Sequence, residues 1–372
     1  MKVFKNISIV IGTRPEAIKL APLIIEFKKS PILRTRVILT GQHKEMVKQV
    51  MDLFEIKEDI NFEIMNIKQT LEEITSKVLI KLNNEFLNFR PDLLIVQGDT
   101  TTSFTSALSA FYKNIPIAHV EAGLRTNNLS NPFPEEVNRR LISQLASLHF
   151  APTSTSLENL KKSDVLGSIH LTGNTVIDAL YLAQKKRPNI NLTKFGLKKN
   201  KFILVTIHRR ENWGEKLESI ILALKKLLEI KPDLKIILPM HKNEVLRKTI
   251  KKILEHNPRA ILIEPLNYVD LIYIIENCYL LVTDSGGLQE EAPSLGKPVL
   301  VVRETTERQE AVNAGTAILV GTKTKNIVKN IIELIENKNK YNLMAKSINP
   351  YGDGKSSKRI VEICKSFLFE NI

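Results

Sequence analysis

The chain has 372 residues, of which 43% are hydrophobic and 25% charged, a composition typical of a globular protein and unlike disordered, collagenous or coiled-coil chains. At roughly 100–200 residues a domain, this length predicts two or three domains. No uncharged apolar run approaches the roughly 18 residues of a membrane span, and the apolar run ending at Ile11 is too short for a secretory signal. We therefore expect a cytoplasmic protein with no membrane partner.

The chain is basic, with 54 Lys and Arg against 40 Asp and Glu and a formal net charge of +14. Such a balance is typical of proteins that bind nucleic acids, anionic membranes or phosphate-bearing substrates. The lysines occur as scattered pairs, such as Lys28-Lys29 and Lys225-Lys226, and only 6% of the residues are aromatic. This pattern favours solvated helix faces over a nucleic-acid groove.

Neither a disulfide framework nor a metal site is predicted. The two cysteines, Cys278 and Cys364, are far apart in apolar surroundings, and no HExxH spacing occurs. We expect two buried thiols and no metal.

Short apolar runs alternate along the chain with stretches in which apolar residues recur every three or four positions, as in Ile18, Ala21 and Ile25. Continuous apolar strands that alternate with helices predict parallel sheets covered on both faces. The predicted strands, in chain order, are Ile7–Ile11, Val37–Leu39, Leu93–Val96, Ile117–Val120, Ser147–Ala151, Ile169–Thr172, Phe202–Thr206, Lys235–Pro239, Ala260–Ile263, Leu280–Thr283 and Val299–Val302.

The chain contains a weak internal repeat. The segment Ile9–Arg14 is matched in shape by Leu204–Arg209 about 195 residues later, and Leu94–Thr100 is matched by Leu280–Gly286. The repeat predicts an α/β protein of two doubly wound halves, each with polar residues at its strand carboxyl ends, where open α/β sheets bind ligands. We expect one domain over 1–175, completed by an amphipathic helix over 355–372, and a second over 176–354.

In the first half, Gly12-Thr13-Arg14-Pro15-Glu16 follows the first strand. Thr13 and Glu16 have the spacing of a capping box, and Pro15 suits a first helical turn. Backbone amides and Arg14 at a helix start would suit an anion, although an ordinary capped helix with an exposed arginine is the alternative.

Carboxylates gather after the strands of the first half. Asp99 and Glu121 each follow a strand, and Glu135 and Glu136 lie in the segment beyond. Carboxylates at one sheet edge can supply an acid and a base for proton transfer. Glu135 also stands four residues before Arg139, so a surface salt bridge is its alternative role.

In the second half, His208-Arg209-Arg210 stands at the end of the first strand, which favours phosphate contact over a solvated turn. The segment Thr283–Gly287 ends a strand and opens a helix, where glycines permit close approach to a phosphate. The alternative is a turn that needs glycine for its conformation alone. Glu291 follows at a spacing that could reach a ribose. No GxGxxG follows the first strand and no P-loop occurs, so we expect no dinucleotide cofactor.

These motifs together resemble the non-hydrolysing UDP-N-acetylglucosamine 2-epimerases, over about residue 7 to Gly354. The resemblance rests on 12–19, 98–102, 119–126, 134–136, 138–139, 173–175, 208–211, 283–287, 289–293 and 304–308. It implies a GT-B arrangement, with two Rossmann-like domains facing across a cleft, and interconversion of UDP-GlcNAc and UDP-ManNAc. The family is thought to eliminate UDP, leaving 2-acetamidoglucal, and then to re-add it, without a cofactor.

The resemblance also implies roles for individual residues. Asp99, Glu121, Glu135 and His208 look like catalytic groups. The residues that look like substrate ligands are Arg14, Lys19, Arg139, Ser285, Gly286, Gly287, Glu291 and Arg308. Bacterial members bind a second UDP-GlcNAc as activator, and the matching positions are Gln42, His43, Gln69, Arg210 and His241. Lys68 stands where an arginine is expected, a departure that bears on this activator site.

Three other functions remain open at this point. A GT-B glycosyltransferase would pass the sugar to an acceptor, and a hydrolysing epimerase would release free ManNAc. A nucleotide-sugar sensor would keep the ligands of the second half without needing Asp99, Glu121 and Glu135 together. We expect a homodimer, and we expect closure of the two halves on the substrate through hinges near Gly173–Pro188 and Asn349–Gly354.

Overall fold

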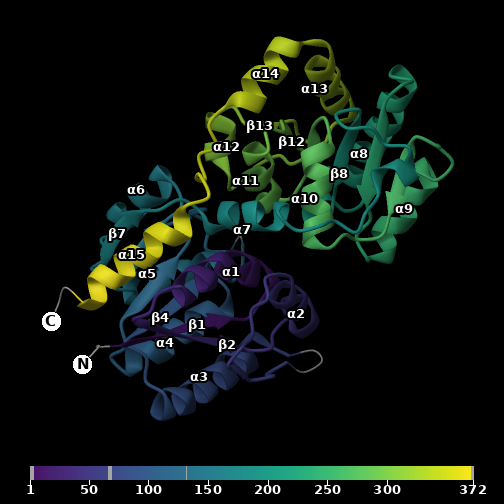
Figure 1. Ribbon diagram of the computed structural model, residues 1–372. Helices are drawn as coiled ribbons and strands as arrows, with labels where there is room; N and C mark the ends of the chain where they lie inside the picture. The colour runs from purple at the N-terminus through teal and green to yellow at the C-terminus, as the bar shows by residue number, and fades with distance from the viewer. Residues whose placement is uncertain (1–3, 66–68, 131, 370–372) are drawn as a thin grey trace. The chain divides into compact units, whose positions relative to one another are not determined.

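The computed structural model describes residues 4–65, 69–130 and 132–369, which divide into two α/β units (Figure 1). Unit 1 holds the described residues up to Ala179 together with those from Tyr351 onward, and unit 2 runs from Leu180 to Pro350. The first boundary lies inside helix α7 (Thr175–Gln184).

Unit 1 is built on a seven-stranded parallel sheet in the order β3-β2-β1-β4-β5-β6-β7. Ile9 of the central strand β1 pairs with Val37 on one side and Ile95 on the other. The chain order of the strands reverses between β1 and β4, which makes that point the topological switch point of the sheet. The strands are β1 (Lys5–Ile11), β2 (Leu33–Leu39), β3 (Ile60–Asn61), β4 (Leu93–Gln97), β5 (Ile117–Val120), β6 (Leu148–Ala151) and β7 (Ser168–Leu171).

Helices cover this sheet because its strands are apolar on both faces. Val78 and Leu82 of α3 pack with Ala107 of α4 onto Val10 and Leu94 of the strands, and α15 packs against α1. Each buried aliphatic side chain contributes about 1.5–3 kcal/mol to stability. The helices are α1 (Arg14–Lys28), α2 (Lys44–Leu53), α3 (Leu71–Asn88), α4 (Thr101–Tyr112), α5 (Glu135–Leu145), α6 (Ser154–Lys162), α7 and α15 (Ser356–Phe369).

Unit 2 repeats the topology with six parallel strands in the order β10-β9-β8-β11-β12-β13, so its switch point lies between β8 and β11. The strands are β8 (Phe202–Thr206), β9 (Lys235–Pro239), β10 (Ala260–Ile263), β11 (Leu281–Thr283), β12 (Val299–Val301) and β13 (Ala317–Leu319). The helices are α8 (Glu215–Ile230), α9 (Glu244–Leu254), α10 (Tyr268–Asn277), α11 (Gly286–Ser294), α12 (Gln309–Asn313), α13 (Thr324–Glu336) and α14 (Lys338–Lys346), with two 3₁₀ turns, η1 (Leu192–Phe195) and η2 (Arg210–Asn212).

The predicted fold class, α/β with two Rossmann-like units of the GT-B type, is confirmed. All eleven predicted strands form, and β3 and β13 are additional short edge strands. The internal repeat has a structural counterpart, because β1 and β8 hold the same place in their sheets, as do β4 and β11. Both cysteines are buried and free. Of the helices that the structure describes, none is long and apolar enough to cross a membrane.

Candidate active site

The predicted site residues follow strands at or next to the two switch points. In unit 1, Arg14 comes after β1, and Asp99 and Glu121 come after β4 and β5. In unit 2, His208 comes after β8 and Ser285 after β11. Open α/β sheets bind their ligands at these carboxyl edges, so both units have the geometry of a ligand site.

Glu121 is held in place by its backbone and by three donors. Its φ of 63° lies in the left-handed region, which costs a non-glycine residue about 1–3 kcal/mol and is common at functional sites. Lys19 Nζ lies 2.6 Å from both of its carboxylate oxygens, Asn174 Nδ2 donates at 2.9 Å, and Gln97 Nε2 donates as well. These donors satisfy the ionised, acceptor-only form of the carboxylate.

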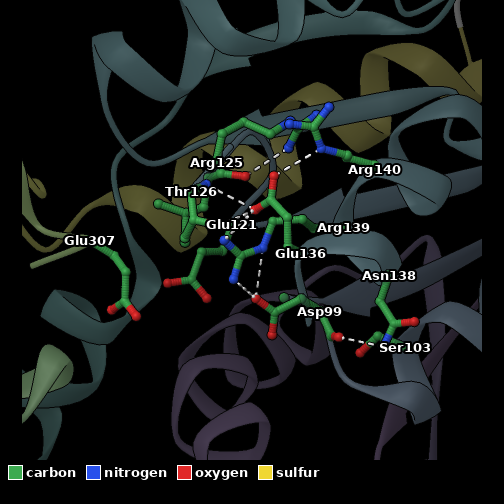
Figure 2. Close-up of polar contacts among 12 residues, drawn as sticks. Asp99, Ser103, Glu121, Arg125, Thr126, Glu136, Asn138, Arg139, Arg140 and Glu307 are labelled. Atoms are coloured by element: carbon green, nitrogen blue, oxygen red, sulfur yellow. Dashed lines mark hydrogen bonds and ion pairs between the residues drawn. The ribbon is translucent and has the colours of Figure 1, made fainter. Parts of the chain in front are cut away.

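Asp99 lies beside Glu121 but has a different environment. Burial raises the pKa of its carboxyl, the nearby Arg139 opposes that rise, and repulsion from Glu121 adds to it, so the net direction is upward. Arg139 donates to Asp99 Oδ2 from Nε at 3.1 Å and from Nη2 at 2.5 Å, as Figure 2 shows. Two neighbouring carboxyls whose environments differ in this way can serve as a proton donor and a proton acceptor.

Glu135 and Glu136 open helix α5 with opposite surroundings. Glu136 is fully buried, accepts the backbone N–H of Thr126 at 2.9 Å, and pairs with Arg139 and Arg140 (Figure 2). Arg139 therefore pairs with Asp99 and Glu136. Glu135 Oε2 is buried and has no hydrogen-bond partner within the described part of the chain. The alternative role of Glu135, a salt bridge with Arg139, is thus not seen in the described part of the chain.

Glu16 connects the two turns of the unit 1 switch point. Its carboxylate accepts the backbone N–H of Thr13 at 2.5 Å, which is the Glu16 contact of the predicted capping box. It also accepts the backbone N–H of Gly12 at 2.8 Å and the hydroxyls of Thr100 and Ser103, each at 2.6 Å. Gly12 is close-packed as well, since a Cβ there would lie 2.4 Å from Thr102 Oγ1. The turn carrying Arg14 and the turn carrying Asp99 are therefore fixed to one another.

In unit 2, Asp284 organises the turn that carries His208. Its carboxylate is fully buried and accepts the backbone N–H groups of His208 and Arg209 and the side-chain amide of Asn212, at 2.9–3.1 Å. The imidazole Nδ1 of His208 lies 3.1 Å from Asp284 Oδ1. The polar turn predicted after β8 is therefore anchored by the turn after β11.

Ser285, Gly286 and Gly287 form the start of α11, as predicted. Neither glycine has a positive φ, and the nearest atoms to an added Cβ would be Arg209 Nη2 at 3.5 Å and Glu291 Oε2 at 3.9 Å. The alternative that these glycines are needed for turn conformation alone is therefore wrong. The start of a helix without side chains over its amides is suited to an anion.

The two remaining predicted ligands of unit 2 have buried partners. Tyr268 Oη donates to Glu291 Oε1 at 2.6 Å, and Arg308 Nε donates to the buried Glu290. Both side chains are therefore oriented by neighbours on α10 and α11.

The predicted activator residues come from both units. Gln42 accepts a hydrogen bond from Thr102 at 2.9 Å, and His43 is the N-cap of helix α2. Burial lowers the pKa of His43, and the charge of Glu16 opposes that shift. Gln69 also belongs to unit 1, whereas Arg210 and His241 belong to unit 2. Lys68 lies outside the described residues.

Sequence reasoning missed the residues that hold the candidate catalytic groups and ligands. Gln97 and Asn174 bond to Glu121, Tyr268 bonds to Glu291, and Asp284 faces His208. Asn174 and Asp284 stand inside motifs that were singled out, so their polarity beside a strand end was an available signal. Gln97 stands at the strand end within the repeat segment Leu94–Thr100 and had the same signal, whereas Tyr268 had no local signal.

Comparison with known proteins agrees with this geometry. A family model described as UDP-N-acetylglucosamine 2-epimerase matches residues 25–365. The UDP-N-acetylglucosamine 2-epimerase of Campylobacter jejuni is 47% identical over 371 residues, covering 96% of this chain and 97% of that protein.

Several similar solved structures carry bound nucleotides. The crystal structure of UDP-GlcNAc 2-epimerase from Neisseria meningitidis bound to UDP-GlcNAc has a TM-score of 0.88 and 45% identity, covering 97% of this chain and 100% of that one. The enzyme from Methanocaldococcus jannaschii, in complex with UDP-GlcNAc and UDP, has a TM-score of 0.80 and 34% identity, covering 97% and 99%. From the family model and these full-length similarities, the chain belongs to the UDP-N-acetylglucosamine 2-epimerase family.

Proposed function

We propose that this chain interconverts UDP-GlcNAc and UDP-ManNAc by the non-hydrolysing route. UDP is eliminated to leave 2-acetamidoglucal, and it then re-adds with a proton delivered to the other face of carbon 2. The hydrogen on carbon 2 has no adjacent carbonyl and is not acidic, so elimination offers a path that simple deprotonation lacks. The product would supply surface polysaccharide or glycan synthesis from the cytoplasm.

One observation carries the proposal: Asp99 and Glu121 lie side by side with different partners. Glu121 is paired with Lys19 at 2.6 Å, which suits an ionised base, whereas burial raises the pKa of Asp99, which suits a proton donor. Glu135, whose Oε2 is buried without a partner among the described residues, is the third candidate for proton transfer. A sensor that only binds a nucleotide sugar would not need this set.

The second requirement of the mechanism is that UDP stays bound while it is detached. The start of α11, His208 and the oriented Glu291 are the groups of unit 2 that would hold the diphosphate and the ribose. Arg14 in unit 1 would add a positive charge. The reaction therefore needs groups of both units on one substrate molecule, and domain closure is part of the proposal.

Proton NMR of the purified protein with UDP-GlcNAc in deuterated water tests this function. We expect UDP-ManNAc to appear without added nicotinamide or metal, with deuterium at carbon 2 of both sugars. Glu121→Gln should lower turnover by about 10²-fold or more. Glu158→Gln is the matched control, since it makes the same change at an exposed carboxylate on α6 paired with Lys161.

Each alternative has its own outcome in that experiment. Free ManNAc as the main product would indicate a hydrolysing epimerase. Sugar transfer only after an acceptor is added would indicate a glycosyltransferase. UDP binding without turnover would indicate a sensor. Any of the three would overturn the proposed reaction.

We also propose that the chain forms a homodimer. Helices α3 and α4, which pack together, expose the large apolar side chains of Ile80, Leu87, Phe111 and Tyr112 at 53–69%. Apolar residues gathered on neighbouring helices are typical of a protein–protein interface. Sedimentation of the wild type and of Leu87→Glu would test it, and a monomeric wild type would refute it.

A further inference from the structure

His208 has one ring nitrogen against a buried carboxylate. Its Nδ1 lies 3.1 Å from Asp284 Oδ1; the Asp284 side chain has no exposed surface, whereas that of His208 is 42% exposed. Asp284 follows β11 and His208 follows β8, the two strands that flank the switch point of unit 2. The carboxylate therefore lies behind the histidine, on the side away from solvent.

The remaining partners of Asp284 are all donors. They are the backbone N–H groups of His208 and Arg209 and Nδ2 of Asn212. Burial by itself raises the pKa of the Asp284 carboxyl, but contact with the His208 ring and these backbone N–H groups outweighs it, so the pKa is lowered. An ionised carboxylate can only accept hydrogen bonds.

We propose that Asp284 is a positioning residue that places the proton of the neutral His208 ring on Nδ1 and leaves Nε2 for the ligand. An unprotonated Nδ1 would direct its lone pair at an ionised carboxylate 3.1 Å away, which is repulsive. The buried carboxylate also fixes the turn that carries the ring, through both backbone N–H groups. That Nε2 then faces UDP rests on the proposed function. Because a diphosphate oxygen accepts hydrogen bonds, Nε2 must carry a second proton when it contacts that oxygen.

The tautomer can be measured in the resting protein, independently of any turnover. In the wild type labelled with ¹⁵N-histidine, long-range proton–nitrogen correlation reports which ring nitrogen carries the proton. His208→Gln identifies the signals of His208. At a pH where the ring is neutral, we expect the proton on Nδ1. In Asp284→Asn the side-chain amide can donate to Nδ1, so the proton should move to Nε2.

Kinetics then test whether Asp284 acts through His208. We expect Asp284→Asn to lower kcat by about 10²-fold with a smaller change in KM. In a His208→Gln background the same substitution should lower kcat by less than about 2-fold, because residues that act as a unit are not additive. A purely structural role would give the same factor in both backgrounds.

Asp270→Asn is the matched control. Asp270 is also a buried aspartate of unit 2 that accepts two backbone N–H groups, from Asn189 at 2.7 Å and Ile190 at 3.0 Å. The Asp270→Asn variant should have a lower melting temperature but the same His208 tautomer as the wild type. A wild-type ring protonated on Nε2, an unchanged tautomer in Asp284→Asn, or fully additive losses of kcat would each overturn the inference. Absence of epimerase turnover would refute the proposed function and leave the tautomer result standing.

Discussion

Mild acid should destabilise unit 1 through two buried histidines, His119 on β5 and His149 on β6. Neither side chain is exposed, and the two residues are register partners in the sheet. Burial lowers the pKa of His119 to about 3 and that of His149 to about 4, against about 6.5 in an unfolded chain. Both rings are therefore neutral in the folded unit at pH 7.

The sign follows from proton linkage. Below pH 6.5 the unfolded chain takes up protons on these rings, and the folded unit does not until the pH approaches the lowered pKa values. The free energy of unfolding of unit 1 is thus unaffected by protonation of these histidines above pH 6.5 and decreases as the pH falls below it. At about 1.4 kcal/mol per pH unit, a fall from about pH 6.5 to about pH 5 costs roughly 2 kcal/mol per histidine and roughly 4 kcal/mol for the pair.

Hydrogen exchange followed by mass spectrometry, corrected for the intrinsic effect of pH, measures this locally. Peptides covering β5 and β6 should lose protection between pH 6.5 and pH 5, whereas peptides covering β8 and β9 should keep theirs. His119→Gln retains a donor for the Gly98 carbonyl, which lies 2.7 Å from His119 Nε2, and should roughly halve the pH dependence. Equal pH slopes in the variant and the wild type would refute the reasoning.

Three further predictions concern the groups that hold the site. Glu16→Gln replaces one of two acceptor oxygens by a donor, so it should lower the melting temperature and reduce turnover by about 10-fold. If neither value changed, the contacts of Glu16 with the two switch-point turns would not be needed. Tyr268→Phe removes the hydroxyl that donates to Glu291 at 2.6 Å and should weaken UDP binding in calorimetry by about 10-fold, and an equal affinity would remove Glu291 from the site. Lys19→Met leaves the Glu121 carboxylate without its cation, so chemical denaturation should find the Lys19→Met/Glu121→Gln double variant more stable than Lys19→Met alone; the reverse order would contradict the ion pair.

The strands were predictable because strands of a covered parallel sheet are continuously apolar. β3 and β13 were not predicted because each has at most three residues and lies at a sheet edge. An apolar run of that length cannot be distinguished from a loop. The candidate site was predictable at the level of turns, since the carboxyl ends of parallel strands meet at one edge. Thus Arg14, Asp99 and His208 could be placed before the structure was known.

The side-chain contacts within the site could not be predicted in the same way. The contact from Lys19 to Glu121 joins residues 102 positions apart, and that from Asn174 spans 53 positions. Arg139 illustrates the consequence: local spacing predicted a pair with Glu135, whereas Arg139 pairs with Glu136 on the same helix and with Asp99, 40 positions away. Local spacing describes only residues on the same helix, whereas Lys19, Asn174 and Asp99 reach their partners from other elements.

The two units show that topology and chemistry are separable. Asp99 and Asp284 each follow the fourth strand of equivalent sheets, β4 and β11. The Asp99 side chain is 23% exposed and faces Arg139, and its pKa is raised by burial; the Asp284 side chain is fully buried and faces His208, and its pKa is lowered despite burial. The fold therefore places a carboxyl at the equivalent sheet edge of each unit. The partners supplied by other elements make one a candidate for proton transfer and the other a support for a histidine.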